Sequence, residues 1–580
     1  MGGFFLVCRS QNEDRTEELN RLQTAFTQIG FTAPEIIADD AYIFAAYPKF
    51  GTKSPQLKSY PNGDFVFTCG TCISSQGVGV SAADAFYQGG DRVETDFISG
   101  HFVVVVRKGG KTTINMDQFG GYHVYFNAER RIISSSFYAI SSALPSLTLR
   151  RQAAYEYVFN GVVSGNETIF AEVAVAPIRA CIDVGADGPT IRRTAPNPPK
   201  MTSEEKYSDS VEHGIQLLDR YFGSVVTTFK GRINTALSGG YDSRLMLAGL
   251  RRHGAQPRVY IYGRRQDSEV QLVEAIAKGE GFQLEVIDKE AQQIISPNEF
   301  AEVARQNFFG VDGYNYGGIF HNGAERKESA RRVAGNSIAF NGGGGEIFRN
   351  FFYLLDRPLR VHELLWAFYS GFDPACGTSI FDIDAYYRNL EKKIFEVVGS
   401  DDSWLPRPTV EWLYHNFRCR AWDGKIDTNS NWFGYTAMPF LERRITEHAS
   451  RLPLRWKYHG AYEAALIERI DAKLAAYPSN YGHSFEQPRT LGRRAGDYAT
   501  YIRPPWLRRY SHRIKHRTSN PRELRGYLAP AYQDAVLPGG PEIIRRLFRL
   551  DRVRNSNHYA RVLSLEYALR QFGSALKVDF

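Results

Sequence analysis

The strongest constraint on the fold is an alternation of short and long apolar segments across residues 231–288. GRINTALSGG, PRVYIYG and QLEVID are short runs typical of buried strands. Between them lie DSRLMLAGLRRHG and SEVQLVEAIAKGEG, whose apolar residues recur at helical spacing. A strand–helix–strand–helix–strand order at this spacing predicts a parallel, doubly wound sheet.

The stretch SGGYDS, residues 238–243, falls where the first of these strands meets its helix. In an open parallel sheet, ligands bind at this edge. Gly239 and Gly240 have no Cβ atom, so backbone N–H groups can approach an anion, and the following helix adds the positive end of its dipole. Asp242 offers a carboxylate for a divalent cation. The stretch is either a sharp connecting turn or a phosphate loop, and it differs from the Gly-Lys-Ser/Thr nucleotide loop because no Lys follows.

The 580 residues are too many for one ordinary core, and the pattern divides them into four segments. Residues 1–194 contain short apolar runs separated by Gly and Asn/Asp turns, which predicts a strand-dominated antiparallel domain that begins with a strand rather than a signal peptide. APNPPK, residues 195–200, is expected to be a linker, since repeated Pro continues neither a helix nor a strand. Residues 201–488 open with a capping-box sequence, TSEE, and a helix to about residue 222. Residues 489–580 form a basic C-terminal extension.

Several stretches together resemble one protein family. SGGxDS between a strand and a helix looks like the pyrophosphate loop of the ATP pyrophosphatases, which cleave ATP between the α and β phosphates. Residues 99–126 and 132–144 resemble the N-terminal segment of asparagine synthetases. NGGGGEIF, residues 341–348, resembles the second glycine-rich loop of that family, and residues 437–454 resemble its Pro-Phe-Leu-Asp segment. The order of these pieces resembles the asparagine synthetase / β-lactam synthetase superfamily to about residue 485.

The resemblance implies a fold and a set of ligands. It implies an α/β plus β protein: an N-terminal antiparallel sandwich of the Ntn type (a degenerate glutamine amidotransferase domain), then a doubly wound ATP-pyrophosphatase-type synthetase domain with many helices. It implies ATP and Mg²⁺, with Asp242 on the metal. Glu346 is a second candidate for the metal in place of the family's Asp, and it also fits a cap for the helix that starts there. The residues expected to bind ATP are Leu237, Ser238, Gly239, Gly240, Asp242, Ser243, Tyr262, Gly263, Gly343 and Gly344.

The chain departs from the family at its N-terminal nucleophile. Glutamine-hydrolysing members carry Cys directly after the initiator Met, whereas this chain has Gly2, which supplies no nucleophile. Cys8 lies inside the first predicted strand and is expected to be buried, as are Cys69 and Cys72 of CGTC, which lack a second ligand pair for zinc. The N-terminal domain is therefore expected to be a retained scaffold. In this it resembles β-lactam synthetases and lasso-peptide macrolactam synthetases, whose amine comes with the substrate.

The reaction implied is that of an ATP-dependent carbon–nitrogen ligase. A carboxylate of a small molecule or peptide becomes an acyl-adenylate with release of pyrophosphate, and attack by an amine then gives an amide and AMP. The amine is expected within the same molecule, on another metabolite, or as free ammonia. Two alternatives stay open: a noncatalytic nucleotide- or partner-binding descendant, and a sulfur-transferring ATP pyrophosphatase acting on RNA. The second is disfavoured because no cysteine lies between Cys181 and Cys376.

Other departures leave the catalytic residues incomplete. The second glycine-rich loop of the family usually ends in Asp-Glu, but Gly345 stands in place of the Asp and Glu346 follows it. The family also places a Lys late in the synthetase domain to stabilise phosphate charge. Lys457 and Lys473 are the candidates, each also consistent with an ordinary surface residue. Tyr241 has no assigned role. Asp267 fits either a substrate contact or a helix N-cap. The candidates for the tyrosine of a Tyr–Glu base are Tyr314, Tyr316 and Tyr353.

Charge and composition bear on partners and location. Residues 489–525 hold eleven Lys/Arg against Asp497 and Glu523, which fits a solvated surface or a docking patch for an acidic partner or an anionic surface. No recognisable nucleic-acid-binding module accompanies this charge, so nucleic acid is not expected. No run of eighteen apolar residues predicts a membrane span, and six cysteines in so long a chain fit a reducing, cytoplasmic setting. The oligomeric state stays open.

Overall fold

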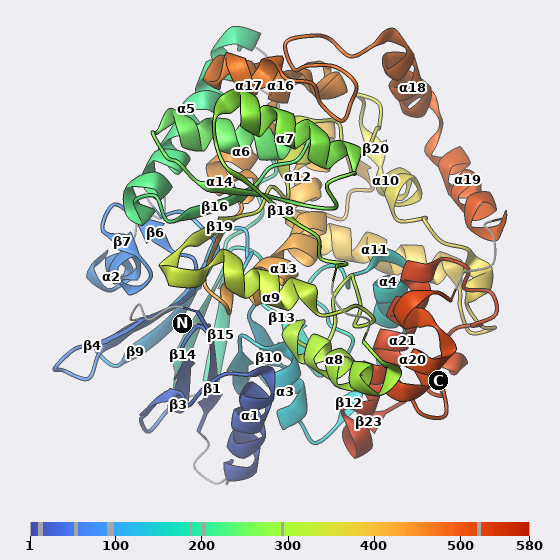
Figure 1. Cartoon of the computed structure of the whole chain (residues 1–580). Coiled ribbons are helices and arrows are strands. Elements are labelled where there is room, and N and C mark those ends of the chain that lie inside the picture. Colours follow the sequence, from blue (N-terminus) through green and yellow to red (C-terminus); the bar gives the residue numbers. More distant parts are fainter. Residues whose placement is uncertain are drawn as a thin grey trace.

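The computed structural model arranges the chain as two domains in contact, with the last part of the chain packed against both (Figure 1). The N-terminal domain is built on antiparallel strands and the second domain on a parallel sheet. The residues that the structure describes are 2–9, 15–51, 56–89, 98–185, 188–199, 205–291, 295–518 and 524–578.

The N-terminal domain contains two six-stranded sheets whose described strand pairs are all antiparallel. The first sheet has the order β13 (Val173–Val175), β10 (Tyr125–Asn127), β11 (Ile132–Ser134), β1 (Gly3–Cys8), β3 (Tyr42–Tyr47) and β2 (Glu35–Ala38). The second has the order β15 (Gly188–Arg193), β14 (Ala180–Gly185), β9 (Lys111–Met116), β8 (Phe102–Lys108), β5 (Phe65–Gly70) and β4 (Leu57–Ser59). The predicted antiparallel sandwich is thus confirmed.

Strand β1 shows why the two sheets stack. It is buried on both faces, so its residues alternate between two cores rather than between core and water. Phe4 and Leu6 join the core between the sheets. Phe5 and Val7 face the other way, into a core shared with helix α1 (Thr16–Ile29). Helix α2 (Val80–Gly89) covers the outer face of the second sheet. The result is a helix–sheet–sheet–helix stack.

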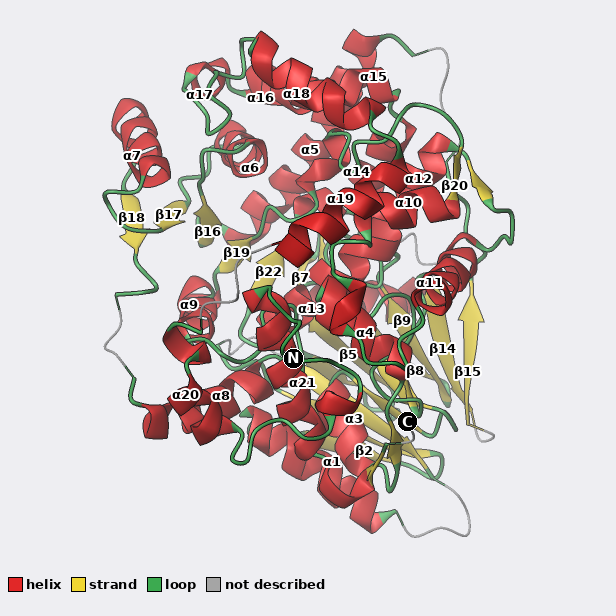
Figure 2. Ribbon diagram, turned by 90° about the vertical axis from the view of Figure 1, so that its right-hand side faces the viewer, coloured by secondary structure: helices red, strands yellow, loops and turns green. Residues whose placement is uncertain are grey.

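The second domain is built on a five-stranded parallel sheet, as the alternation of segments predicts. Its order is β18 (Leu284–Ile287), β17 (Arg258–Tyr262), β16 (Ile233–Ala236), β19 (Ile338–Phe340) and β22 (Tyr435–Ala437), and Figure 2 shows the strands following one another in this sequence. The chain runs from β16 outward to β17 on one side and later returns to β19 on the other. This reversal is the topological switch point at which open parallel sheets bind ligands.

Three helices accompany the first strands of this sheet: α5 (Tyr207–Phe229), α6 (Tyr241–Arg252) and α7 (Ser268–Glu280). Leu247 of α6 and Val273 of α7 share a core with Val259 of β17, so both helices pack on the sheet through their apolar stripes. The predicted capping box Thr202–Glu205 does not open α5, which begins at Tyr207 after the N-cap residue Lys206; residues 200–204 lie outside the described part of the chain.

The segment after residue 489 is not one extension. Helices α18 (Leu491–Ile502) and α19 (Pro505–Thr518) lie on the surface, whereas α21 (Ser556–Arg570) is largely buried and packs against α4 (Arg151–Asn160) of the N-terminal domain. Near the end of the chain, β23 (Leu576–Lys577) pairs in parallel with β12 (Leu147–Thr148). The last part of the chain therefore ties the two domains together. Of the helices described, none has the length and apolar character needed to cross a membrane.

The two domains meet along helix α13 (Arg420–Asn431), whose polar side chains are buried. Asp427 accepts hydrogen bonds from Thr436 Oγ1 at 2.6 Å and Asn431 Nδ2 at 3.1 Å, and its carboxylate lies 3.0 Å from His101 Nδ1 of the N-terminal domain. Burial works against a charged imidazole, but the hydrogen bond and charge of Asp427 outweigh it and raise the pKa of His101 to about 9.

This ion pair makes the domain contact sensitive to pH. Because the folded-state pKa of His101 lies above the ordinary value of 6.5, its protonation stabilises the fold fully below that value and the contribution is lost as the pH rises toward 9. We therefore expect the wild type to have a higher free energy of unfolding than His101→Gln at pH 6.5. This difference should shrink by about 3 kcal/mol as the pH rises to 9. Denaturant unfolding of both proteins at several pH values checks this, and a constant difference would contradict it.

Candidate functional site

The SGGYDS loop leaves the carboxyl end of β16 and runs directly into α6, as predicted. Ser238 Oγ and Ser243 Oγ lie 2.9 Å apart, and the amides of Ser238 and Gly240 donate to Ser243 Oγ at 2.9 Å and to Ser238 Oγ at 3.2 Å. The two serines thus fasten the loop to the first turn of the helix. Gly240 is the N-cap of α6 and provides no side-chain cap, so the positive end of the helix dipole faces the loop.

Gly239 is needed because Asn480 lies very close to it, a contact that was not predicted from the sequence. A Cβ atom there would lie 2.1 Å from Asn480 Oδ1, and Asn480 N donates to the Gly239 carbonyl at 3.1 Å. The amide of Gly239 donates to Glu269 Oε1 of α7 at 3.1 Å. The N–H group that was predicted to bind phosphate therefore donates its hydrogen bond to the Glu269 carboxylate. Glu269 lies in the first turn of α7, where acidic residues are common for helix-dipole reasons, so the pattern gave no functional signal.

The second glycine-rich loop lies against the first. Gly343 N donates to Asn341 Oδ1 at 2.9 Å, and Gly344 turns the chain with φ at +87°. A Cβ atom on Gly345 would lie 1.8 Å from Asp242 Oδ1. Glycine stands in place of the expected Asp because the carboxylate of Asp242 fills the space that a side chain at position 345 would need.

Arg349 brings the acidic residues of the site to one point. Its Nη2 atom donates to both carboxylate oxygens of Asp242 at 2.9 Å and lies 3.8 Å from Glu346 Oε1. Its Nε atom lies 3.3 Å from Glu463 Oε2, from α16 (Ala461–Ile470). Glu346 also accepts a hydrogen bond of 2.7 Å from the hydroxyl of Tyr414. The structure thus brings together the two predicted metal-binding carboxylates, and adds an arginine and a third carboxylate.

The cluster holds more acid than its one cation balances. Burial raises the pKa of Asp242, against the lowering effect of Arg349, and burial together with the Asp242 charge raises the pKa of Glu463 well above its ordinary value. Glu463 is fully buried. Burial and the mutual repulsion of their charges therefore disfavour the ionised forms of Asp242 and Glu463. Glu463 was detectable in the sequence as an acid on the buried face of a helix, next to Leu466 and Ile467.

Tyr241, the variable position of the loop, is buried beside the site. Its ring stacks on Phe485 with centroids 4.1 Å apart, and its hydroxyl lies 3.2 Å from His483 Nε2. The guanidinium of Arg349 lies 5.7 Å from the centroid of the Tyr241 ring. Tyr241 thus connects the loop with residues 480–485.

Neither candidate lysine reaches the loop. Lys473 is an exposed residue whose Nζ lies 3.1 Å from Glu280 Oε1 and from the Gly279 carbonyl, at the end of α7 opposite Glu269. Lys457 is buried, and its Nζ donates to Glu411 Oε2 at 2.6 Å. Burial lowers the pKa of Lys457, and the charge of Glu411 opposes this. The expectation of a surface residue is therefore right for Lys473 and wrong for Lys457, and Arg349 is a cation that does contact the loop.

The residues after β17 form a separate part of the same edge. The Nζ atom of Lys289 lies 3.5 Å from the centroid of the Tyr262 ring, and Gly263 has φ at +141°. Asp267 is the N-cap residue of α7, but its side chain accepts from Arg264 N at 2.8 Å rather than capping the helix. Tyr262 is the last residue of β17, the strand next to β16, and Gly263 follows it, so both lie at the carboxyl edge of the sheet.

The position of the expected N-terminal nucleophile is closed. Gly2 N donates to the Tyr47 carbonyl at 2.9 Å, and the Gly2 carbonyl accepts from the hydroxyl of Tyr122 at 2.6 Å. A Cβ atom on Gly2 would lie 2.8 Å from the ring of Phe31. The predicted buried cysteines are buried as free thiols, and burial raises the pKa of Cys8 to about 11 and of Cys69 to about 12; Cys72 shifts in the same direction.

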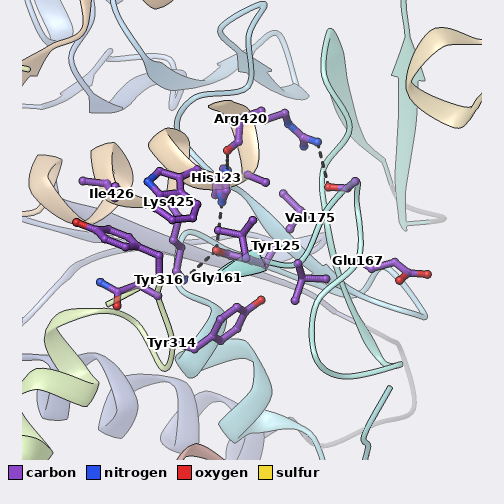
Figure 3. Close-up of a pocket in the computed structure, with 16 residues that line it drawn as sticks. His123, Tyr125, Gly161, Glu167, Val175, Tyr314, Tyr316, Arg420, Lys425 and Ile426 are labelled. Carbon is purple, nitrogen blue, oxygen red and sulfur yellow. Dashed lines mark hydrogen bonds between the residues drawn. The ribbon is translucent and has the colours of Figure 1, made fainter. Parts of the chain in front are cut away.

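A pocket between the domains holds two of the candidate tyrosines (Figure 3). The ring centroid of Tyr314 lies 5.3 Å from Lys425 Nζ, and Tyr316 stacks on Trp422 with centroids 4.6 Å apart. No lining residue of this pocket belongs to either glycine-rich loop. Tyr353 lies elsewhere and stacks on Tyr501. The structure therefore does not bring these three tyrosines together as a base.

Comparison with known proteins leaves the family open. No protein-family model and no curated protein matches the chain. Two similar solved structures are the allosteric regulatory enzyme of purine biosynthesis (8% identity, TM-score 0.24, covering 51% of this chain and 81% of that one) and glutamine phosphoribosylpyrophosphate amidotransferase from B. subtilis complexed with ADP and GMP (8% identity, TM-score 0.21, 49% and 65%). Likenesses this low carry no argument about function.

The close approach of Gly345 to Asp242 predicts a coupled pair. We expect Gly345→Ala to lower the free energy of unfolding by about 1–3 kcal/mol, because the new methyl group and the Asp242 carboxylate compete for one space. The cost should fall sharply in an Asp242→Ala background, where that space is empty. Denaturant unfolding of the two single variants and the double variant measures the coupling, and additive effects would refute the contact.

Proposed function

We propose that the chain is an ATP-dependent carbon–nitrogen ligase of the asparagine synthetase / β-lactam synthetase superfamily, which adenylates a carboxylate and releases pyrophosphate. The observation that carries the proposal is the contact between Asp242 of the first glycine-rich loop and Arg349 behind the second. Both loops meet at the switch point of a parallel sheet. Such an edge, with glycine backbone and a helix N-terminus, suits a chain of phosphates.

The residues present fit a nucleotide bound with Mg²⁺. Asp242 and Glu346 supply two carboxylates beside Arg349, and Mg²⁺ needs only one or two when phosphates and water complete its shell. The described residues contain no group of three His, Cys, Asp or Glu able to hold a metal alone, which agrees with a metal that arrives with its nucleotide. Mg²⁺ bound there would neutralise phosphate charge.

The chain's own groups have distinct tasks in this proposal. The amides of the loop and the first turn of α6 orient the phosphates. The guanidinium of Arg349 neutralises negative charge that develops on the pyrophosphate leaving group as the carboxylate oxygen attacks the α phosphorus, the task for which the sequence suggested a lysine. Glu269 leaves the Gly239 amide when a phosphate oxygen takes its place. In the second step the amine attacks the acyl carbon, loses a proton and expels AMP.

The N-terminal domain supplies no amine in this proposal. Gly2 has no nucleophile, and the ring of Phe31 fills the space beside it. We interpret the sandwich as an Ntn-type glutamine amidotransferase domain that has lost its reaction and kept its packing. The amine then comes from the substrate itself, from a second metabolite or as ammonia, and the carboxylate belongs to a small molecule or a peptide.

A noncatalytic descendant that binds nucleotide or a partner is the second candidate. The observation in its favour is that both oxygens of Asp242 are engaged by Arg349 and that Gly345 offers no replacement carboxylate. If this candidate is right, the protein binds ATP without turnover. The two candidates thus differ in a measurable step.

Exchange of labelled pyrophosphate into ATP tests the proposal. With a pool of candidate carboxylates and Mg²⁺, we expect exchange by the wild type and a loss of about a hundredfold or more in Arg349→Met, because a preorganised cation at the developing charge is removed. Asp242→Asn should lose as much. Arg357→Met is the matched control, since its exposed pair with Glu363 at 2.6 Å lies outside the site, and its rate should stay within about twofold.

Calorimetry with ATP separates the outcomes. ATP binding without exchange for any carboxylate would assign the chain to the noncatalytic candidate. Full exchange in Arg349→Met would leave ligase chemistry standing but remove the arginine from it. Absence of both binding and exchange would refute a nucleotide site at this loop.

A further inference from the structure

The exposed apolar side chains of the described residues gather on two consecutive helices. Thirteen large apolar residues are exposed in the described chain, and seven of them lie on α18 and α19. They are Leu491 (81% exposed), Tyr498 (63%), Ile502 (51%), Trp506 (52%), Leu507 (39%), Tyr510 (50%) and Ile514 (62%). These two helices make up a small part of the chain, so the concentration marks an interaction surface. Figure 1 shows α18 and α19 at the margin of the molecule.

The spacing of these residues is helical. Leu491, Tyr498 and Ile502 recur at intervals that place them on one side of α18, and Trp506, Tyr510 and Ile514 recur every four residues along α19. A surface helix normally turns such a stripe toward the core. Here each stripe faces water instead.

The side of α19 that contacts the protein is polar. Arg508 is buried and donates hydrogen bonds to the carbonyl of Phe352 at 2.9 Å and to that of Thr500 at 2.6 Å. Arg509 places its guanidinium 5.6 Å from the centroid of Trp366 on α10 (Val361–Phe368). The helix therefore contacts the protein through Arg508 and Arg509, whereas Trp506 and Leu507 are exposed. A surface helix usually has its apolar residues buried and its charged residues exposed.

The charged side chains exposed on the two helices themselves are positive. Arg493, Arg494 and Lys515 are exposed. Asp497 is the only acid between residues 489 and 518, and it is engaged inward, 2.7 Å from His459 Nδ1 and 3.0 Å from Arg489. The face thus combines exposed apolar and aromatic side chains with exposed positively charged ones.

We propose that α18 and α19 form a docking surface for an anionic lipid bilayer, on which the apolar stripes enter the headgroup region and the basic side chains meet lipid phosphates. Helices with Trp and Leu on one face and Lys or Arg beside them bind the membrane interface by these two contributions. Tyr and Trp suit this depth because each has an apolar ring and a polar atom. A second copy of this chain fits less well, since two faces of like charge would repel. The surface is independent of the ATP chemistry proposed above.

Vesicle flotation with the full-length protein tests the proposal. We expect binding to phosphatidylcholine vesicles that contain phosphatidylserine, and at least about tenfold weaker binding to phosphatidylcholine alone. Replacing Ile502, Trp506 and Leu507 by Ser should weaken binding at least about tenfold. The matched control replaces Ile380, Trp404 and Leu355 by Ser, the same residue types at 39%, 45% and 41% exposure on other surfaces, and should bind as the wild type does.

A charge variant separates the two contributions. The double variant Arg493→Gln, Arg494→Gln should show a weaker preference for phosphatidylserine. The matched control is Arg264→Gln, Arg265→Gln, two consecutive exposed arginines on another surface, and it should keep the wild-type preference. All substituted side chains are at least partly exposed, so unchanged far-UV circular dichroism and melting temperature establish that each variant is folded. Equal loss in stripe and control variants, or no vesicle binding by the wild type, would overturn the proposal. So would a dimer in light scattering that the stripe variant alone dissociates, because the face would then bind a second copy.

Discussion

The arrangement of the two domains depends on a buried carboxylate, Asp312, that belongs to one domain and serves the other. It follows α8 (Pro297–Gly310) and accepts hydrogen bonds from the amides of Phe137 and Tyr138, at 2.7 and 3.0 Å, at the start of α3 (Phe137–Ala143). Lys425 of α13 donates to the same carboxylate at 3.0 Å. Removing one partner of such a buried pair typically costs about 3–5 kcal/mol. The domains are thus joined by hydrogen bonds from two amides of one domain to a buried carboxylate of the other.

This junction gives the N-terminal sandwich a structural role in the whole molecule. Its strands and α3 supply partners to α13, and α13 lies directly before β22 of the parallel sheet. Loss of the N-terminal domain would take the Phe137 and Tyr138 amides from Asp312, the Tyr125 hydroxyl from Lys425 and the His101 ring from Asp427. The domain therefore has a structural role at the junction, and Gly2 is buried against Phe31 and contributes to its packing.

The sequence predicted the secondary structure of the sheets and the place of the loop well, because both follow from periodicity. The runs ending in SGGYDS became a parallel sheet with the loop at its edge, as local pattern requires. It did not predict Arg349 or Glu463 in the site. Arg349 lies in IFRNFF, where one charge in an apolar run has no periodic signature, and Glu463 lies far along the chain. The contacts of both are long-range, so only the folded chain brings them to Asp242.

Gly345 and Arg349 act together on the charge of the site. A carboxylate at position 345 would stand against Asp242 and add repulsion to a cluster whose burial already raises the pKa of Asp242 and Glu463. Glycine removes that charge, and arginine four residues later adds a permanent positive one that does not depend on pH. In the proposed reaction, a cation fixed in the protein is already in place when phosphates arrive, whereas a lysine in a buried site loses its charge more readily. Gly345 and Arg349 are thus consistent parts of one site.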